Sequence, residues 1–293
     1  EKNTEYVYKY RIGPAEEDWS GNWEEYLDDC GTGPWGDRYF TTDLSDSMSV
    51  GPFCWNSCEN CELPNRSLNF DGVEDYVSID ESYFNLYYGE GDDCNYTISA
   101  KIKIEDLTNE GIILGNGDNS TGLYVKITST GRVNLHIGEE NFYSSDEIIQ
   151  ENIWYNLLIS TDCYTTNYLW VNDIQYEIDN GNMDINYTSR NLYFGHSNGI
   201  DYEFSTDNRF KGFLDEVYII QSFCTPDNYS DYNFSNPEEI SGLMGFWNFN
   251  DGEGSTLTDL SGNGNHGTIY GATWSDDVMQ PPYNGPEWFV SMD

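Results

Sequence analysis

Short apolar runs separated by glycine- and asparagine-rich turns make up residues 66–276 of this sequence. The runs are rich in Tyr, Trp, Ile, Val and Thr, the residues that favour strands. Turn sequences such as 116–122 and 261–267 separate them, and no long helical period appears between them. Many short strands at regular spacing predict an antiparallel β-sandwich. We expect strands at 67–70, 75–79, 96–104, 111–115, 123–128, 132–138, 141–145, 154–161, 167–176, 191–195, 210–220, 242–249 and 267–274, and at most one helical turn, within 227–240.

The charge balance restricts the partners of the chain. Fifty-two acidic residues against twelve basic ones give a formal net charge of −40. Nucleic acid and anionic membranes are excluded as partners, because both attract basic surfaces. Such a surface suits hard cations or a saline medium. No apolar run approaches the length of about 20 residues that a membrane span needs, and residues 1–10 are not a signal peptide. We expect an extracellular or cell-surface protein whose signal peptide has been removed.

Seven cysteines favour disulfides in an oxidising compartment. Residues 1–62 have little periodicity, and we expect them to form a loop-rich segment held by Cys30, Cys54, Cys58 and Cys61. A zinc cluster at 54–61 is the alternative, but no compact second Cys/His pair accompanies it. Because seven is odd, at least one thiol is free or pairs between molecules. Six N-x-S/T sequons permit glycosylation, at Asn65, Asn95, Asn119, Asn186, Asn228 and Asn233.

Five segments in a fixed order carry a family resemblance. LNFDGVEDYVSI, YTISAKIKI, WYNLLIST, NYLWVNDIQY and FKGFLDEVYII resemble the strands of laminin-G-like, concanavalin A-like jelly-roll domains. GFWNFNDGEGSTLTDLSGNGNHGTIYGATW, residues 245–274, resembles the W-x-F…S-G-N element of that family. The resemblance implies an all-β antiparallel jelly-roll sandwich over 63–276. It leaves the N-terminal segment, 1–62, and a Pro-rich tail, 277–293, outside the domain.

The closing element departs from the family's order. In many members the W-x-F…S-G-N element opens the domain, whereas here it comes last. Because the termini of a sandwich lie close together, an ordinary final strand is one interpretation. The alternative is that this element, or the 277–293 tail, pairs with the next molecule by strand addition.

The loop at 259–265 has the spacing of a calcium site. Oxygen-bearing side chains recur at every second position, and glycines lie among the spacers, as in D-x-[DNS]-x-[DN]-G loops. A glycine-rich turn with Asx hydrogen bonds is the alternative. The four residues whose oxygens would bind calcium are Asp259, Ser261, Asn263 and Asn265.

The resemblance implies a second calcium site and one disulfide. The family's F-D-G and D-E-V positions are Asp71 and Asp215 here, on neighbouring strand ends where calcium is often held, and Asp75 is near the first of them. The same fold implies a Cys94–Cys224 disulfide. Cys163, which we expect on a hairpin, is the candidate for the unpaired cysteine.

The sequence contains no catalytic motif. Related jelly-roll glucanases carry E-x-D-x-x-E or E-x-D-x-E on one strand, and the nearest stretch, GFLDEVYII, has a single Asp-Glu pair. We therefore expect a protein that is not an enzyme. Sugar binding, the family's other use, needs aromatic platforms, but we expect Trp154, Trp170, Trp247 and Trp274 to pack in the core.

Two functions remain open. The first is an extracellular structural or adhesive protein, stabilised by calcium and assembling with copies of itself through its terminal segments. The second is a calcium-dependent carbohydrate-binding module.

Overall fold

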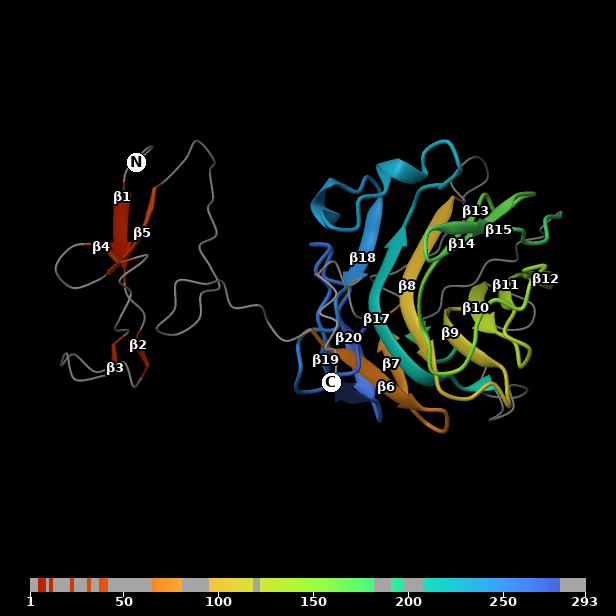
Figure 1. Cartoon of the computed structure of the whole chain (residues 1–293), viewed down its shortest axis with the longest axis horizontal. Coiled ribbons are helices and arrows are strands. Elements are labelled where there is room, and N and C mark those ends of the chain that lie inside the picture. Colours follow the sequence, from red (N-terminus) through yellow and green to blue (C-terminus); the bar gives the residue numbers. More distant parts are fainter. Residues whose placement is uncertain are drawn as a thin grey trace, which may run out of the picture. The chain divides into compact units, whose positions relative to one another are not determined.

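The computed structural model describes residues 65–80, 95–117, 122–181, 191–197 and 208–279, together with the backbone of five short strands near the N-terminus. Contacts divide the chain into two units, Glu1–Leu63 and Pro64–Asp293 (Figure 1). In the first unit, β5 (Asp37–Thr41) pairs with β1 (Glu5–Tyr8) and β4 (Gly31–Thr32), and β2 (Arg11–Ile12) pairs with β3 (Asn22–Trp23). Cys30, Cys54, Cys58 and Cys61 lie outside the described residues.

The second unit is a sandwich of two antiparallel sheets, which confirms the predicted fold class. The β8 sheet has the order β15 (Ile174–Tyr176), β14 (Asn167–Val171), β13 (Trp154–Thr161), β8 (Tyr96–Ile104), β17 (Lys211–Ile220), β6 (Ser67–Asp71) and β21 (Thr273–Ser275), with β18 (Leu243–Trp247) paired to β17. The β10 sheet has the order β12 (Glu140–Tyr143), β11 (Val133–Ile137), β10 (Leu123–Ile127), β9 (Gly111–Gly115), β16 (Leu192–Phe194), β7 (Tyr76–Ile79), β20 (Gly267–Tyr270) and β19 (Thr256–Leu257). Among the described residues the only helices are two 3-10 turns, η2 (Tyr229–Asp231) and η3 (Pro237–Glu239).

Alternation along the strands builds the core between the sheets. In β8 the even-numbered residues from Ile98 to Ile104 are buried in one hydrophobic cluster with side chains of the β10 sheet such as Val125 and Leu135. The odd-numbered residues of β8 include Lys101 and Lys103. Successive strand residues point to opposite faces, so the lysines of β8 lie on the outer face of its sheet.

The closing element contributes strands to both sheets. The run expected as one strand at 267–274 is two strands, because Gly271 turns the chain with a φ of 78°. β20 pairs with β7 in one sheet, and β21 pairs with β6 in the other. Only glycine fits at position 271, since a Cβ atom there would lie 2.0 Å from Asp75 Oδ1. The element therefore pairs within its own chain as an ordinary closing strand, and residues 280–293 lie outside the described residues.

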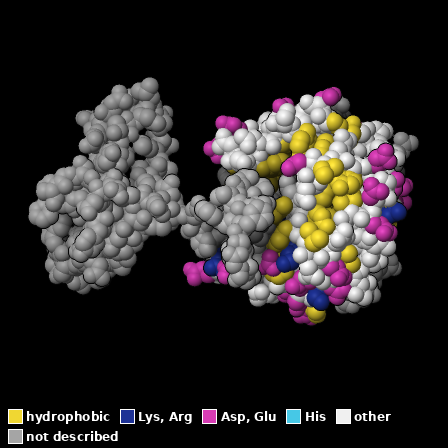
Figure 2. Space-filling view, viewed as in Figure 1, with side chains coloured by type: hydrophobic (Ala, Val, Ile, Leu, Met, Phe, Trp, Pro, Cys, Tyr) yellow, Lys and Arg dark blue, Asp and Glu magenta, His cyan; other side chains and the backbone are white. Residues whose placement is uncertain are grey.

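Residues 276–277 lie on the outer face of the β8 sheet. Asp277 accepts hydrogen bonds from Trp154 Nε1 at 2.9 Å and from Lys103 Nζ at 2.5 Å. Its carbonyl oxygen accepts the Ser67 hydroxyl at 2.6 Å, and Asp276 forms an ion pair with Arg66. Figure 2 shows a patch of apolar side chains on the face of the second unit that is in view, with acidic side chains around it. No helix among the described residues has the length and apolar character of a membrane span.

Candidate functional site

The 259–265 loop is closed by its own hydrogen bonds. Asp259 Oδ1 accepts the backbone N–H groups of Phe246 at 3.1 Å and Ser261 at 2.9 Å. Asp259 Oδ2 accepts the Ser261 hydroxyl at 2.9 Å and the backbone N–H of Asn265 at 2.8 Å. Asn263 and Asn265 direct their amide nitrogens to the Met244 carbonyl. This is the Asx-turn alternative. A calcium ion would have to displace N–H donors from Asp259, so the loop as it lies does not fit a calcium cage.

The second set of predicted ligands is only partly brought together. Asp75 Oδ2 accepts the backbone N–H of Asp71 at 2.8 Å, and burial raises the pKa of Asp75. Asp215 does not lie next to Asp71. The residue of β17 that pairs with Asp71 is Lys211, four residues before Asp215. Four strand residues span about 13 Å. The described residues contain no group of three or more His, Cys, Asp or Glu side chains suited to a metal ion. Calcium binding by this chain stays a prediction.

The cysteine pairing expected from the resemblance is wrong at Cys224. Cys224 is a free thiol with no exposed surface, packed with Leu158 and Trp170, and burial raises its pKa to about 12. Cys163, expected to be unpaired, is disulfide-bonded. Cys94 lies outside the described residues. The family fold brings strand ends close, but a disulfide also depends on the directions of the Cβ atoms, which motifs do not specify.

The described sequons differ in exposure. Asn65 and Asn233 are exposed, Asn95 is half-buried, and Asn228 donates its amide to the Phe223 carbonyl at 3.1 Å. Asn119 and Asn186 lie outside the described residues. Glycosylation stays a prediction at every one of them.

Three tyrosines form an aromatic surface on the outer face of the β10 sheet. Tyr76 of β7 stacks on Tyr270 of β20, with ring centroids 4.6 Å apart, and contacts Tyr193 of β16 at 5.9 Å. Tyr76 and Tyr193 are half-buried, and Tyr270 is 46% exposed. Because these strands are neighbours and the three side chains share one face, the rings form a continuous apolar surface. We call these three residues, with His196 and Arg209, the tyrosine cluster.

His196 and Arg209 supply the polar part of the tyrosine cluster. His196 lies 6.0 Å from the Tyr193 ring and 6.4 Å from the Tyr76 ring. It is 3% exposed, and neither of its ring nitrogens has a hydrogen-bond partner in the part of the chain that the structure describes. Burial, together with Arg209, lowers its pKa to about 3. The Arg209 guanidinium lies 6.0 Å from the centroid of Tyr76. A neutral imidazole offers one donor and one acceptor. His196 and Arg209 therefore place hydrogen-bonding groups next to the tyrosine rings.

The strand register continues this surface across the sheet. Tyr193 and Tyr124 are both paired with Gly115, and a Cβ at Gly115 would lie 2.3 Å from Tyr124 Cβ. Tyr124 stacks on His136 at 4.2 Å, and both side chains are buried. The line of paired residues across the sheet is Thr268, Ser78, Tyr193, Gly115, Tyr124, His136 and Asn141. We did not predict this row, although the tyrosines occupy the outward positions of the strand alternation, which is the signal that would have found it.

The comparisons with known proteins identify the family. The model described as the concanavalin A-like lectin/glucanases superfamily matches residues 71–228, more than half of the 293 residues. The chain belongs to this superfamily. This confirms the resemblance carried by the motifs. A comparison with curated protein sequences gives no match.

Solved structures of the superfamily's fold are similar to this chain at low identity. A protein from Bacteroides ovatus, described as a "putative carbohydrate binding protein", is 15% identical with a TM-score of 0.54, over 94% of this chain and 70% of that one. A SAP-like pentraxin from Limulus polyphemus is 13% identical with a TM-score of 0.42, over 58% of this chain and 82% of that one. Domains LG4-5 of the mouse laminin α1 chain are 13% identical with a TM-score of 0.41, over 55% of this chain and 42% of that one.

The superfamily includes glucanases, so the carboxylates of β17 deserve comparison with a hydrolase site. Asp215 has no exposed surface, and burial raises its pKa to about 7. Glu216, with a φ of 44°, forms an ion pair with Lys101 at 2.6 Å and lines a depression of about 310 Å³. Glycosidases place two carboxyl groups on either side of the scissile bond. Here one carboxyl group is buried and the other is neutralised by a lysine.

Tryptophans of this superfamily member mostly pack as predicted. Trp247 has no exposed surface and donates Nε1 to the Asn265 carbonyl at 3.0 Å, and Trp170 is 4% exposed. Trp274 packs against the core from a half-buried position. Trp154 is the exception, because it lies half-buried on the outer face of the β8 sheet beside Phe213.

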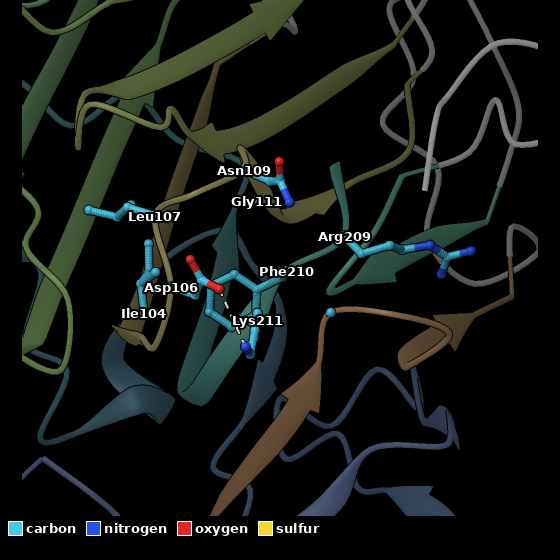
Figure 3. A pocket seen from close by; sticks show the side chains of 9 residues that line it. Ile104, Asp106, Leu107, Asn109, Gly111, Arg209, Phe210 and Lys211 are labelled. Carbon is cyan, nitrogen blue, oxygen red and sulfur yellow. Dashed lines mark hydrogen bonds and ion pairs between the residues drawn. The ribbon is translucent and has the colours of Figure 1, made fainter. Parts of the chain in front are cut away.

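A small cavity adjoins Arg209 on the side away from the tyrosines. It measures about 50 Å³ and is lined by the 104–111 loop and residues 209–211. In Figure 3 the Arg209 side chain points away from this cavity, and Lys211 pairs with Asp106 beside it. A water molecule occupies about 30 Å³ in the liquid, so the cavity is of water size and is not a sugar site.

Proposed function

We propose that this chain is an extracellular carbohydrate-binding domain whose glycan lies on the tyrosine cluster. The observation that carries the proposal is the contact of three tyrosine rings from adjacent strands, Tyr270, Tyr76 and Tyr193, on one exposed sheet face. Sugar rings present a face of C–H groups that packs on aromatic rings, while their hydroxyls need polar partners at the edge. Ligand sites combine apolar surface with a few convergent polar groups in this way.

The neighbouring polar groups support the same proposal. Both ring nitrogens of His196 and Nη1 of Arg209 are buried and have no hydrogen-bond partner among the described residues. A buried polar group without a partner costs about 1–3 kcal/mol, and sugar hydroxyls both donate and accept. The Bacteroides ovatus protein, which shares the fold, is itself described as carbohydrate binding. A binding role without catalysis is supported by Asp215 and Glu216. Asp215 is buried and Glu216 is paired with Lys101, so they do not form a carboxyl pair that faces a substrate.

Calcium stabilisation and self-assembly remain parts of the proposal that rest on composition. The net charge of −40 favours divalent cations on the surface. Assembly with further copies would use the 1–62 segment or the 280–293 tail. A glycan-binding domain at the cell surface and an adhesive assembly are compatible, because repeated copies multiply weak sugar contacts.

The proposal is tested by isothermal titration of the chain with neutral hexasaccharides, namely cellohexaose, xylohexaose and laminarihexaose. We expect at least one to bind, and Tyr270→Ala and Tyr76→Ala each to weaken that binding tenfold or more. Tyr164→Ala is the matched control, since Tyr164 is 48% exposed and Tyr270 is 46% exposed. The proposal fails if none of the three hexasaccharides binds, or if Tyr270→Ala and Tyr76→Ala bind like the original chain. Release of reducing ends during incubation would show an enzyme instead.

A further inference from the structure

A second depression lies at the free edge of the β8 sheet. It has a volume of about 450 Å³ and lies where β14 begins and where residues 177–180 leave β15. The volume falls in the range of small-molecule sites, about 300–1,000 Å³. The edges of the two sheets meet here, because Ser144, beyond β12, forms a bridge with Ile178. The depression shares no residue with the tyrosine cluster.

Asn167 gives this depression an unused hydrogen-bond acceptor. The Asn167 side chain lines it, and the residue is 2% exposed. Its amide nitrogen donates to the Asp179 carbonyl at 3.0 Å, and its backbone N–H donates to Asn180 Oδ1 at 2.5 Å. Asn167 Oδ1 is buried and has no partner among the described residues. The bond from the amide nitrogen to the Asp179 carbonyl fixes the amide's orientation, so Oδ1 is an acceptor for a donor that enters the depression.

The walls are aromatic and fixed in place. Tyr168 contacts Trp170 at 5.8 Å and Phe223 at 5.5 Å. Tyr176 of β15 packs against the hydrophobic core. Both tyrosines line the depression. Aromatic walls held by packing need no ordering when a ligand arrives, which reduces the entropy lost on binding.

The described charged groups that line the depression are acidic. Glu177 and Asp179 are exposed, and no Lys or Arg is among the described residues that line it. Asp179 Oδ2 accepts the backbone N–H of Tyr143 at 3.1 Å. A site with carboxylates and an unused amide oxygen offers acceptors to its ligand, so it favours a ligand rich in donors and repels an anion.

We propose that this depression, lined by Asn167, Tyr168, Tyr176, Glu177 and Asp179, is a second ligand site that takes an amine-bearing sugar unit. The ammonium group of the sugar faces the carboxylates of Glu177 and Asp179. A hydroxyl of the sugar donates to Asn167 Oδ1, and the sugar ring lies against a tyrosine. The site is independent of the tyrosine cluster and holds even if that surface binds nothing.

The test uses NMR titration of the full chain with three hexoses of similar size, glucosamine, glucose and glucuronate. We expect glucosamine to shift the backbone amides of Asn167, Gln175 and Asn180 and to bind at least fivefold more tightly than glucose. Glucuronate binds most weakly. Shifts confined to Tyr193 and Thr268 would belong to the tyrosine cluster and would overturn the second site.

A charge-neutral variant separates recognition from general attraction. Glu177→Gln keeps the side-chain shape and exposed position, and we expect it to reduce the preference for glucosamine over glucose below twofold. Glu139→Gln, exposed in the turn between β11 and β12, removes the same charge elsewhere and leaves the preference unchanged. The inference is overturned if both variants behave alike, if the preference survives in Glu177→Gln, or if none of the three sugars shifts these amides.

Discussion

Replacing Asp259 by alanine tests how the 259–265 loop is held. The Asp259 carboxylate is 5% exposed and accepts hydrogen bonds from Phe246 N–H, Asn265 N–H and both donors of Ser261. Alanine removes all four acceptor contacts. Ser261 is half-buried and regains water, whereas Asn265 is 3% exposed and does not. The variant therefore leaves at least one backbone donor buried without a partner.

The size of the effect follows from these contacts. A hydrogen bond to a charged acceptor contributes about 1.5–3 kcal/mol. Counting only the two backbone donors outside the loop's exposed part, those of Phe246 and Asn265, we expect Asp259→Ala to lower the free energy of unfolding by about 3–6 kcal/mol. Asp251→Ala is the matched control, since Asp251 is exposed and accepts only the two donors of Thr258. We expect its loss to stay below about 1 kcal/mol.

Urea unfolding followed by circular dichroism measures both variants, with and without EDTA. With a slope of about 3 kcal/mol per molar urea, the midpoint of Asp259→Ala falls by about 1–2 M. EDTA leaves the difference between the original chain and this variant unchanged if the hydrogen bonds hold the loop. A loss below about 1 kcal/mol would refute the reasoning. A difference that disappears in EDTA would show that Asp259 acts through a bound cation.

Three further predictions concern single groups. Burial raises the pKa of Asp215 from 3.8 to about 7, so between these pH values the folded chain holds a proton that the unfolded chain has lost, and stability falls as pH rises. We expect Asp215→Asn to reduce this fall by about 2–4 kcal/mol in denaturant titrations. An equal pH slope in both proteins would contradict this prediction. Cys224 should resist a thiol reagent at pH 8 in the native chain and react after unfolding, while Cys163 should react only after reduction. Peptide mass spectrometry checks both expectations, and labelling of Cys224 in the native chain would contradict its burial. Gly115→Ala should destabilise the chain by about 2 kcal/mol or more, because the added Cβ meets Tyr124. Gly254→Asn, with no atom within 4 Å of the added Cβ, should change the stability by less than about 1 kcal/mol. Equal melting temperatures of the two variants would refute the contact at Gly115.

The strands were predictable because their physical cause is local. The ranges 96–104, 111–115 and 154–161 are strands with the bounds expected from the sequence. Alternation of apolar residues forces one face into the core, and this depends on neighbours along the chain. The hairpin of β14 and β15 is also local, since Asn172 and Asp173 have φ values of 50° and 65°, which suit a tight turn. The range 167–176, which we expected as one strand, is therefore two strands, β14 and β15, joined at Asn172 and Asp173.

The sites were less predictable because they depend on register between distant strands. Tyr76, Tyr193 and Tyr270 come from three separate segments, and only the pairing of β7 with β16 and β20 brings them together. The spacing of 259–265 predicts oxygens turned to one centre, but spacing alone does not say whether a cation or N–H groups occupy that centre. The Asp71 and Asp215 pair failed for the same reason, since a family motif does not give the offset between strands.

Saturation-transfer difference NMR of a bound hexasaccharide tests the central claim most directly, because it reports which sugar protons lie against the protein. We predict the strongest transfer to the C–H protons on one face of the sugar ring, with upfield shifts from the tyrosine ring currents, and loss of both in Tyr76→Ala but not in Tyr164→Ala. Transfer of equal strength in the original chain and Tyr76→Ala would contradict binding on the tyrosine cluster.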